Sequence, residues 1–359
     1  MSIVKSLSVS GYKSIKELKN FELRNLNVLI GANGAGKSNF ISLFRLLNEI
    51  YEQQLQLYLQ KQGGPDTLLH FGRGITDALC VDFCFESEAG EYHYRLELIP
   101  TIDHRLIVAN EYISFMDSQL EPITRGTNEA QLKKSEHTFA PDVRAGMTSW
   151  RVYHFHDTSE TAKVKQRHAS NDNLQLKNDA ANLAAYLRML YEKHPSEYQR
   201  IVETIRLVLP FFHDFVYRQG TQDYVELEWF QTGKLDTPFK AHRLSDGSLR
   251  FICLMTLLLQ PTSLLPHTIL IDEPELGLHP YAISVFADVC KQVAERRQLI
   301  ISTQSVELVN ELSPEDVIVV DQENDASTFR RYTEAELVDW LEEYAMGELW
   351  KRNILGGRP

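Results

Sequence analysis

A glycine-rich segment near the N-terminus has the composition of a phosphate-binding loop. Residues 31–38 read Gly-Ala-Asn-Gly-Ala-Gly-Lys-Ser and match the pattern G-x-x-x-x-G-K-[ST]. Glycines let consecutive backbone N–H groups turn toward phosphate oxygens, and a helix that starts there adds the positive end of its dipole. Lys37 would reach the β- and γ-phosphates, and the Ser38 hydroxyl would bind Mg²⁺. The predicted contact residues are Asn33, Gly34, Ala35, Gly36, Lys37, Ser38 and Asn39.

Two carboxylates follow a second apolar segment. Residues 269–271 are Ile-Leu-Ile, and Asp272 and Glu273 come directly after them. Transfer of a phosphoryl group to water needs one carboxylate that holds Mg²⁺ and another that orients the attacking water. Asp272 fits the metal role and Glu273 fits the catalytic role. A strand that merely ends in two solvated acids is the alternative, and the glycine-rich loop in the same chain favours the catalytic interpretation.

A short polar segment, Leu-Ser-Asp-Gly-Ser at 244–248, opens a long apolar helical pattern. A Ser-x-Gly sequence at a helix N-terminus can bind an anion. An ordinary helix cap by Ser245 or Asp246 explains the segment equally well in isolation. Ser245 precedes Asp272 by 27 residues, and this order of three motifs favours the anion-binding interpretation. The predicted phosphate contacts are Ser245, Asp246, Gly247 and Ser248.

Alternating and helical apolar patterns predict the elements that position these motifs. The loop at 31–38 follows an apolar strand at 26–30 and precedes a helix, which is the context that phosphate binding requires. Residues 117–150 are polar and irregular, and no element is predicted there. The other predicted strands are 2–9, 80–87, 92–100, 107–117, 223–230, 267–274, 298–305 and 316–323. The predicted helices are 39–60, two within 178–212 that begin near Asn178 and Asp179 and are separated at Pro195, a buried one at 244–260, 281–296, and an acidic amphipathic one at 334–350.

The composition is that of a globular chain. The 359 residues are 43% hydrophobic and 24% charged, with a formal net charge of −12. The first 50 residues hold 7 basic and 3 acidic side chains and the last 49 hold 5 and 12, so the net charge describes no single face. No apolar window is long enough to span a membrane and no secretion signal is evident, so we expect a cytoplasmic protein. The four cysteines are expected to be buried thiols; Cys80 and Cys84 share a strand face, without a Cys or His nearby in the sequence to complete a zinc site.

Together the motifs resemble those of ABC-type ATPases, and within them the SMC/RecF-like heads. The matching segments are SVSGYKSI (8–15), GANGAGKSN (31–39), LSDGS (244–248) as a variant of the signature motif, and ILIDEPELGLHP (269–280), and the resemblance covers about residues 1–100 and 212–320. A group of stand-alone bacterial predicted ATPases of the AAA family, without a long coiled coil, is similar also in YHFHDTS (153–159), ISTQS (301–305) and GELWKRNILGGRP (347–359).

The resemblance implies an α/β fold, a P-loop NTPase with the two-lobe architecture of an ABC/SMC head. Residues 1–109 and 212–359 would form the split head. Residues 110–211 would form a partly helical insert in the place where SMC proteins carry their arm. The separation of 235 residues between Lys37 and Asp272 is too long for a compact transporter ATPase and too short for a coiled-coil arm.

The resemblance also implies a mechanism with ATP and Mg²⁺. Two heads would enclose two nucleotides in an ATP-dependent homodimer or higher oligomer, and Ser245 to Ser248 of one subunit would face the P-loop of the other. Lys13 and Ser14 would touch the nucleotide, with an ordinary surface lysine as the alternative. Gln304 occupies the position of the switch histidine and cannot become charged, so hydrolysis is expected to be slow or differently gated. The implied D-loop is Glu275, Leu276, Gly277, Leu278 and His279.

Three features remain open at this level. Gln62 is a candidate for the Q-loop glutamine or a solvated loop residue. A locally basic run, Lys163, Lys165 and Arg167, could contact DNA or a partner, or could be a solvated loop. His154 and His156 have the spacing of one strand face but lack a third metal ligand in the sequence.

The function that the sequence favours is an ATPase that signals to a partner or to DNA. The first hypothesis is the ATPase or sensor component of a bacterial anti-phage defence system whose effector, such as a nuclease, is separately encoded. The alternative is a DNA-repair or recombination ATPase that acts directly on DNA. Only 54 residues follow Ser305, which leaves no room for a fused nuclease domain, and a transporter role is disfavoured by the motif spacing.

Overall fold

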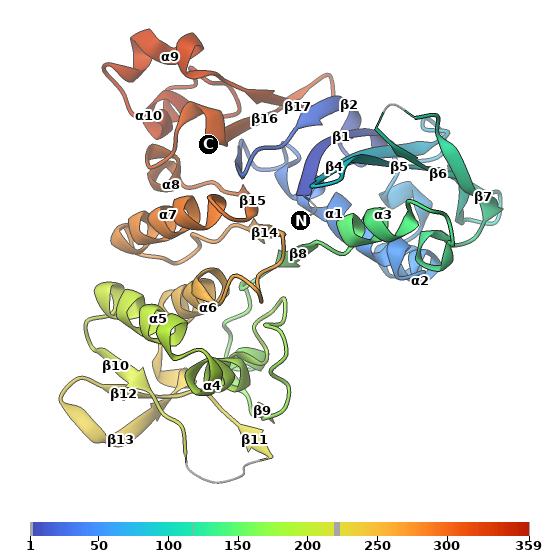
Figure 1. The fold of residues 1–359 in the computed structure, drawn as a ribbon. Helices are drawn as coiled ribbons and strands as arrows, with labels where there is room; N and C mark the ends of the chain where they lie inside the picture. Colours follow the sequence, from blue (N-terminus) through green and yellow to red (C-terminus); the bar gives the residue numbers. More distant parts are fainter. Residues whose placement is uncertain (1–2, 117, 219–222, 359) are drawn as a thin grey trace. The chain divides into compact units, whose positions relative to one another are not determined.

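The computed structural model describes residues 3–116, 118–218 and 223–358, and its chain divides into two compact units (Figure 1). Unit 1 contains residues 1–152 and 313–359, and unit 2 contains residues 153–312. Each unit has its own buried apolar core. The division into a head and an insert at 110–211 stays a prediction.

Unit 1 is built around an antiparallel sheet with the strand order β2-β1-β4-β5-β6-β7. Its strands alternate between buried apolar side chains on one face, such as Val81, Phe83 and Phe85, and polar side chains on the other, as a half-buried sheet requires. The strands are β1 Ile3–Tyr12, β2 Ile15–Glu22, β4 Leu79–Ser87, β5 Gly90–Pro100, β6 Leu106–Phe115 and β7 Glu121–Thr127.

A second group of strands in unit 1 carries the glycine-rich loop. β3 (Leu26–Ile30) is buried along its whole length and runs parallel to β16 (Val317–Glu323), which pairs antiparallel with β17 (Ala326–Arg331). The helix that follows, α1 (Lys37–Tyr51), packs through Phe44 against the ring of Trp150, at the start of β8 (Trp150–Tyr153). The other helices are α2 Leu55–Gln62, η1 Pro65–Thr67, η2 Leu132–Lys134, α3 Ala140–Met147, η5 Pro314–Asp316, α9 Glu334–Leu341 and α10 Met346–Lys351.

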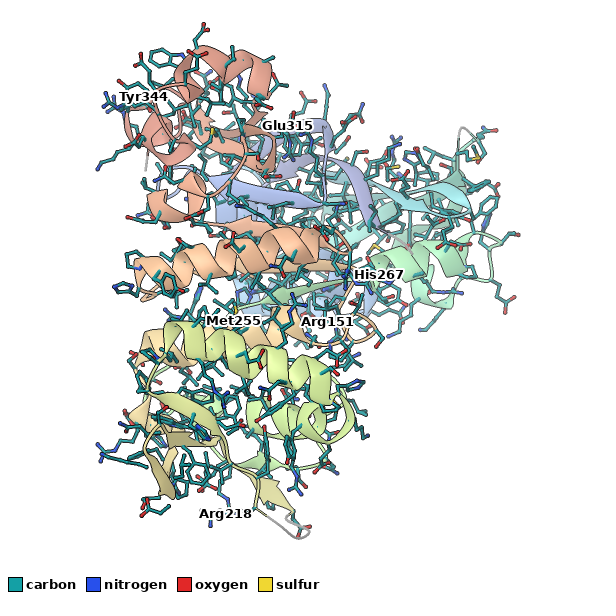
Figure 2. The ribbon with its side chains drawn as sticks, turned by 60° about the vertical axis from the view of Figure 1, so that its left-hand side comes forward. Arg151, Arg218, Met255, His267, Glu315 and Tyr344 are labelled. Carbon is teal, nitrogen blue, oxygen red and sulfur yellow. The ribbon has the colours of Figure 1, made fainter. Side chains whose placement is uncertain are left out.

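Unit 2 is organised around α6 (Asp246–Leu259), which is buried on nearly every side; Met255, labelled in Figure 2, is fully buried. α5 (Pro195–Val208) and α7 (Pro280–Ala294) pack on it, and the strands β14 (Thr268–Asp272) and β15 (Gln298–Ser302) form a parallel pair. The remaining elements are η3 Lys163–Lys165, β9 His168–Ala169, α4 Leu183–Lys193, β10 Phe212–Phe215, β11 Tyr224–Val225, β12 Glu228–Gln231, β13 Lys234–Lys240, η4 Ala241–Arg243 and α8 Val306–Asn310.

Most predicted elements are confirmed, and five differ. The helix predicted at 39–60 is two helices, α1 and α2, because Gln53 between them has φ +60°, outside the helical region. The segment 117–150, predicted as irregular, contains β7 and α3. The strand predicted at 223–230 is two short strands, β11 and β12. The start predicted at Asn178 and Asp179 is wrong: Ala180 has φ +54°, outside the helical region, so α4 begins only at Leu183.

The acidic C-terminal helix predicted at 334–350 is two helices, α9 and α10. Ala345 between them has an extended backbone, and the Glu348 carboxylate accepts a hydrogen bond from its N–H at 3.4 Å, which caps a new helix. Three residues at the boundaries of predicted segments lie outside the described residues: Ser2, Asp117 and Pro359. Among the described residues, no helix is long and apolar enough to cross a membrane.

Candidate nucleotide-binding site

The loop between β3 and α1 has the backbone of a phosphate cradle. Gly34 and Gly36 adopt φ +84° and +118°, which glycine tolerates and other residues rarely do. No atom lies within 4 Å of the position that a Cβ of Gly34 would take, so that side of the loop is open to a ligand. Asn33, Gly34 and Ser38 are exposed, and α1 begins at Lys37. The loop therefore presents backbone donors and a helix N-terminus to solvent.

The Lys37 side chain holds this loop in its curved form. Its Nζ donates hydrogen bonds to the carbonyl oxygens of Gly31 at 2.6 Å and Ala32 at 3.0 Å, and the residue is only 5% exposed. A cation enclosed by the loop carbonyls is positioned to meet phosphate oxygens that approach the same loop. The contact of Lys37 with the phosphates themselves stays a prediction.

Ser327, from β17, is a loop contact that the sequence did not indicate. Its hydroxyl donates to the carbonyl of Ala35 at 2.5 Å and lies 2.7 Å from the hydroxyl of Ser14. A Cβ on Gly36 would stand 2.1 Å from the same hydroxyl. Ser327 therefore supports the phosphate loop from 292 positions further along the chain, and it belongs to no motif.

The predicted residues Lys13 and Ser14 lie beside the first turns of α1. Asn39 donates to the Ser14 hydroxyl at 2.7 Å, and Lys13 Nζ donates to Ser42 Oγ at 3.0 Å. Lys13 is half-buried, and this burial lowers its pKa from the ordinary lysine value. It is thus not the freely solvated surface lysine of the alternative, and its contact with nucleotide stays a prediction.

In unit 2, Asp272 ends β14 and is held from two sides. Ser302, the last residue of β15, donates from its hydroxyl to the Asp272 carboxylate. His156 Nε2 lies 2.8 Å from the Asp272 carbonyl oxygen and donates to it, because a carbonyl only accepts. The sequence showed His156 only as half of a doubtful metal pair. In the structure, His156 instead holds the end of β14 in place through this hydrogen bond.

Glu273 stands just beyond the strand in a left-handed conformation with φ +45°, which is costly for a side chain of this type by about 1 kcal/mol. Its N–H donates to the Ser302 carbonyl at 2.9 Å, which fixes the turn. The carboxylate is half-exposed and accepts a hydrogen bond from the Gln304 side-chain amide. The two predicted catalytic residues, Glu273 and Gln304, therefore touch each other.

Gln304 also contacts the D-loop segment. Its backbone N–H donates to Glu275 Oε1 at 2.8 Å. Glu275 is 9% exposed, its Oε2 atom is buried without a hydrogen-bond partner among the described residues, and burial raises its pKa from the ordinary value of 4.5. Of the other D-loop residues, Leu276, Gly277 and His279 are exposed and Leu278 is half-exposed.

The signature segment caps α6 in the ordinary way and also packs on the D-loop. Ser245 Oγ accepts from the N–H of Ser248 at 3.2 Å. A Cβ on Gly247 would lie 2.1 Å from the carbonyl oxygen of Gly277, so glycine is needed for this close approach. Ser245 and Asp246 are exposed, and Gly247 is half-exposed. The helix N-terminus therefore remains open to a ligand.

Arg250, one turn into α6, links this helix to the His156 segment. Its guanidinium donates to the carbonyls of Phe155 at 2.9 Å and His156 at 3.1 Å, and the residue is 7% exposed. The chain of contacts from Arg250 through His156 to Asp272 was not predicted. A basic residue three positions after a glycine is too common a sequence feature to have indicated it.

The basic run divides in the structure. Lys163 and Arg167 are exposed, whereas Lys165 is buried with its Nζ 3.8 Å from the Asp246 carboxylate. The hypothesis that all three residues contact DNA or a partner is therefore wrong for Lys165, because this side chain is buried beside Asp246. Gln62 is the exposed last residue of α2, and its Q-loop role stays a prediction.

The residues present fit a magnesium nucleotide. In unit 1, the exposed Ser38 hydroxyl is an oxygen donor of the kind that Mg²⁺ prefers, and the open side of the loop at Gly34 can receive phosphate oxygens. In unit 2, Asp272 offers a carboxylate oxygen of the same kind.

Comparison with known proteins supports the fold and the family. A family model described as "AAA domain, putative AbiEii toxin, Type IV TA system" matches residues 26–310. No curated protein matches the chain. Among the solved structures that share its fold are three SMC heads at low sequence identity. An SMC head bound to the C-winged helix domain of ScpA aligns over 94% of this chain and 99% of its own, with 14% identity and a TM-score of 0.63.

The other two structures are also SMC heads. One, derived from Pyrococcus furiosus, has an extended coiled coil and is bound to the C-terminal domain of ScpA; it covers 96% of this chain and 99% of its own, with 16% identity and a TM-score of 0.58. The head from Thermotoga maritima covers 92% and 99%, with 14% identity and a TM-score of 0.50. The expected α/β fold of an SMC-head-like P-loop NTPase is confirmed.

Proposed function

Because the chain belongs to the AAA domain family described as putative AbiEii toxin, Type IV TA system, we propose that it binds and hydrolyses ATP and uses that cycle to signal to a partner. The observation that carries the proposal is the contact of Gln304 with Glu273 at the ends of two adjacent parallel strands, where Asp272 also lies. A carboxylate that accepts from a glutamine amide is held in one orientation, as a group that must align water requires.

We assign the roles residue by residue. Lys37 and the backbone of 33–36 would bind the phosphates, and Ser38 and Asp272 would each supply an oxygen ligand to Mg²⁺. The ion, when bound, neutralises charge on the phosphate oxygens. Glu273 accepts a proton from the attacking water, and Gln304 keeps its carboxylate oriented. Because glutamine stays neutral, the cycle lacks the charge that a histidine would supply at this position, and slow turnover is expected.

We further propose a homodimer that encloses ATP. The exposed N-terminus of α6, with Ser245 and Gly247, supports this proposal because it offers free donors to a phosphate from another subunit. The D-loop packs on Gly247 within the same unit and so would connect the two sites of a dimer.

The partner is proposed to be a separately encoded protein effector in antiviral defence. The family description names a toxin of a toxin–antitoxin system, and two of the SMC heads with this fold are bound to ScpA, so a protein partner suits both. Direct action on DNA in repair is the second candidate, and the exposed Lys163 and Arg167 favour it. A cytoplasmic location fits either role.

The experiment is ATP binding and turnover by the purified chain. The wild type should bind a fluorescent ATP analogue and release phosphate in the presence of Mg²⁺, and Lys37→Ala should abolish both. Lys61→Ala, an exposed lysine at the end of α2, serves as the control. Wild-type protein that binds no nucleotide, or a Lys37→Ala variant that binds as well as the control, would refute the proposal.

A further inference from the structure

The polar face of the large sheet in unit 1 holds a group of side chains with metal-binding chemistry. A thiol, a carboxylate and an imidazole, from Cys84, Glu91 and His93, place one ligand atom each within 4.8 Å of one another. Within the described residues, this is the one group of three or more such side chains. It is separate from the nucleotide-binding residues, which lie on other elements.

Strand pairing brings the three residues together. Cys84 of β4 stands directly opposite His93 of β5, and Glu91 is two positions before His93 and so points to the same face. The expectation from the sequence that Cys84 has no nearby Cys or His partner is therefore wrong. The sequence distance of nine residues between Cys84 and His93 becomes a cross-strand contact once the β4–β5 hairpin sets the register.

The spacing suits a tetrahedral ion. Cys84 Sγ lies 3.6 Å from Glu91 Oε2. Ligands at about 2.0–2.3 Å from a tetrahedral centre are separated by about 3.3–3.8 Å, so this pair already has the required separation. Cys84 is 4% exposed, whereas the side chains of Glu91 and His93 are 39% and 34% exposed, so a solvated ion can reach the group.

Asp82 supplies a carboxylate to the histidine. Its Oδ1 lies 3.5 Å from His93 Nδ1, and its Oδ2 accepts from Arg95 at 2.6 Å, which holds the carboxylate in place. A histidine that binds a metal through one ring nitrogen commonly donates its other N–H to a carboxylate. This arrangement leaves Nε2 of His93 for the ion.

The Lys5 ammonium directly contacts the group. It pairs with Oε1 of Glu91 and so leaves Oε2, the oxygen near the thiol, for another partner. Its side chain is 41% exposed, so the ammonium can also move into solvent when a second cation arrives.

We propose that Cys84, Glu91 and His93 form a zinc site in which water occupies the fourth position, with Asp82 orienting His93. The ligand set selects zinc rather than magnesium, because thiolate and imidazole are ligands of zinc and its neighbours, whereas Mg²⁺ prefers oxygen. The ion would fasten β4 to β5 on the polar face of the sheet.

The test uses Co²⁺ as a spectroscopic probe of the full-length chain after chelator treatment. We expect one Co²⁺ per chain, with the visible bands of tetrahedral cobalt and a thiolate-to-cobalt charge-transfer band, and displacement of both by Zn²⁺. Cys84→Ala should lose the charge-transfer band, and His93→Ala should weaken binding about 100-fold. Asp82→Asn should weaken it about tenfold, because the histidine loses its orienting carboxylate.

Cys80→Ala is the matched control, since Cys80 lies on the same strand and the same face but outside the group. Glu91→Gln, of nearly equal size, distinguishes loss of the carboxylate ligand from loss of folding, and circular dichroism checks each variant. The proposal is overturned by a wild type that binds no Co²⁺, or by a charge-transfer band that survives in Cys84→Ala or disappears in Cys80→Ala. These readouts do not depend on ATP hydrolysis.

Discussion

The Gln304 side-chain amide donates to the Glu273 carboxylate while its backbone N–H donates to Glu275 at 2.8 Å. One residue at the end of β15 thereby connects the proposed catalytic carboxylate with the first residue of the D-loop. Because both contacts belong to unit 2, the catalytic group and the D-loop are coupled before any nucleotide or second subunit arrives.

Glu273→Gln should block turnover and trap the ATP-bound assembly. The amide keeps the size of the side chain but cannot accept a proton from water, so we expect a loss of kcat on the order of 100-fold or more. Size-exclusion chromatography with ATP should then show a larger species than without ATP. Glu295→Gln, an exposed site just after α7, should behave as the wild type. An unchanged elution volume with ATP argues against the dimer mechanism.

Gln304→Ala should reduce kcat on the order of tenfold to 100-fold, because Glu273 loses the donor that orients it. The KM for ATP should change little, because the phosphate-binding residues lie on other elements. Steady-state phosphate release measures both constants. A normal kcat in Gln304→Ala would show that the Glu273 contact has no catalytic role, and Gln304→His tests whether a chargeable group speeds the reaction.

Gly247→Ala should abolish turnover and leave nucleotide binding intact. The added Cβ would stand 2.1 Å from the Gly277 carbonyl oxygen, so the signature segment and the D-loop must separate. Fluorescent ATP binding and phosphate release distinguish the two effects. Gly74→Ala is the control, since no atom lies within 4 Å of its Cβ position. Equal activity in both variants would mean that the close packing is not needed.

Glu275→Gln should be more stable than the wild type, and its advantage should grow as pH rises. Burial raises the pKa of Glu275 in the folded protein above the ordinary value of 4.5. At a pH between 4.5 and the folded-state pKa, Glu275 is therefore protonated in the folded protein and ionised in the unfolded chain. The wild type therefore loses stability as pH rises through this window, whereas Glu275→Gln, whose amide does not ionise, does not lose stability for this reason. Thermal melts at pH 5 and pH 8 measure the difference. A variant whose advantage does not grow with pH would contradict the buried carboxylate as the cause.

Consecutive residues were enough to predict the parts of the site that depend on local geometry. A phosphate loop needs glycine dihedral angles and a helix start, and both are encoded within residues 31–38. Asp272 and Glu273 follow an apolar strand for the same local reason. The fold class came from the resemblance of the motifs to those of SMC/RecF-like heads.

Only the tertiary structure decided which distant residues meet. Ser327 on Ala35, His156 on Asp272 and the burial of Lys165 depend on how separate elements pack, which no local pattern contains. The group at Cys84 and His93 depends on strand register, and a shift of one residue would turn the pair to opposite faces. The sequence by itself determined the chemistry of each motif, because that chemistry is local. The supporting contacts required the fold, because cross-strand and interhelical distances exist only after packing.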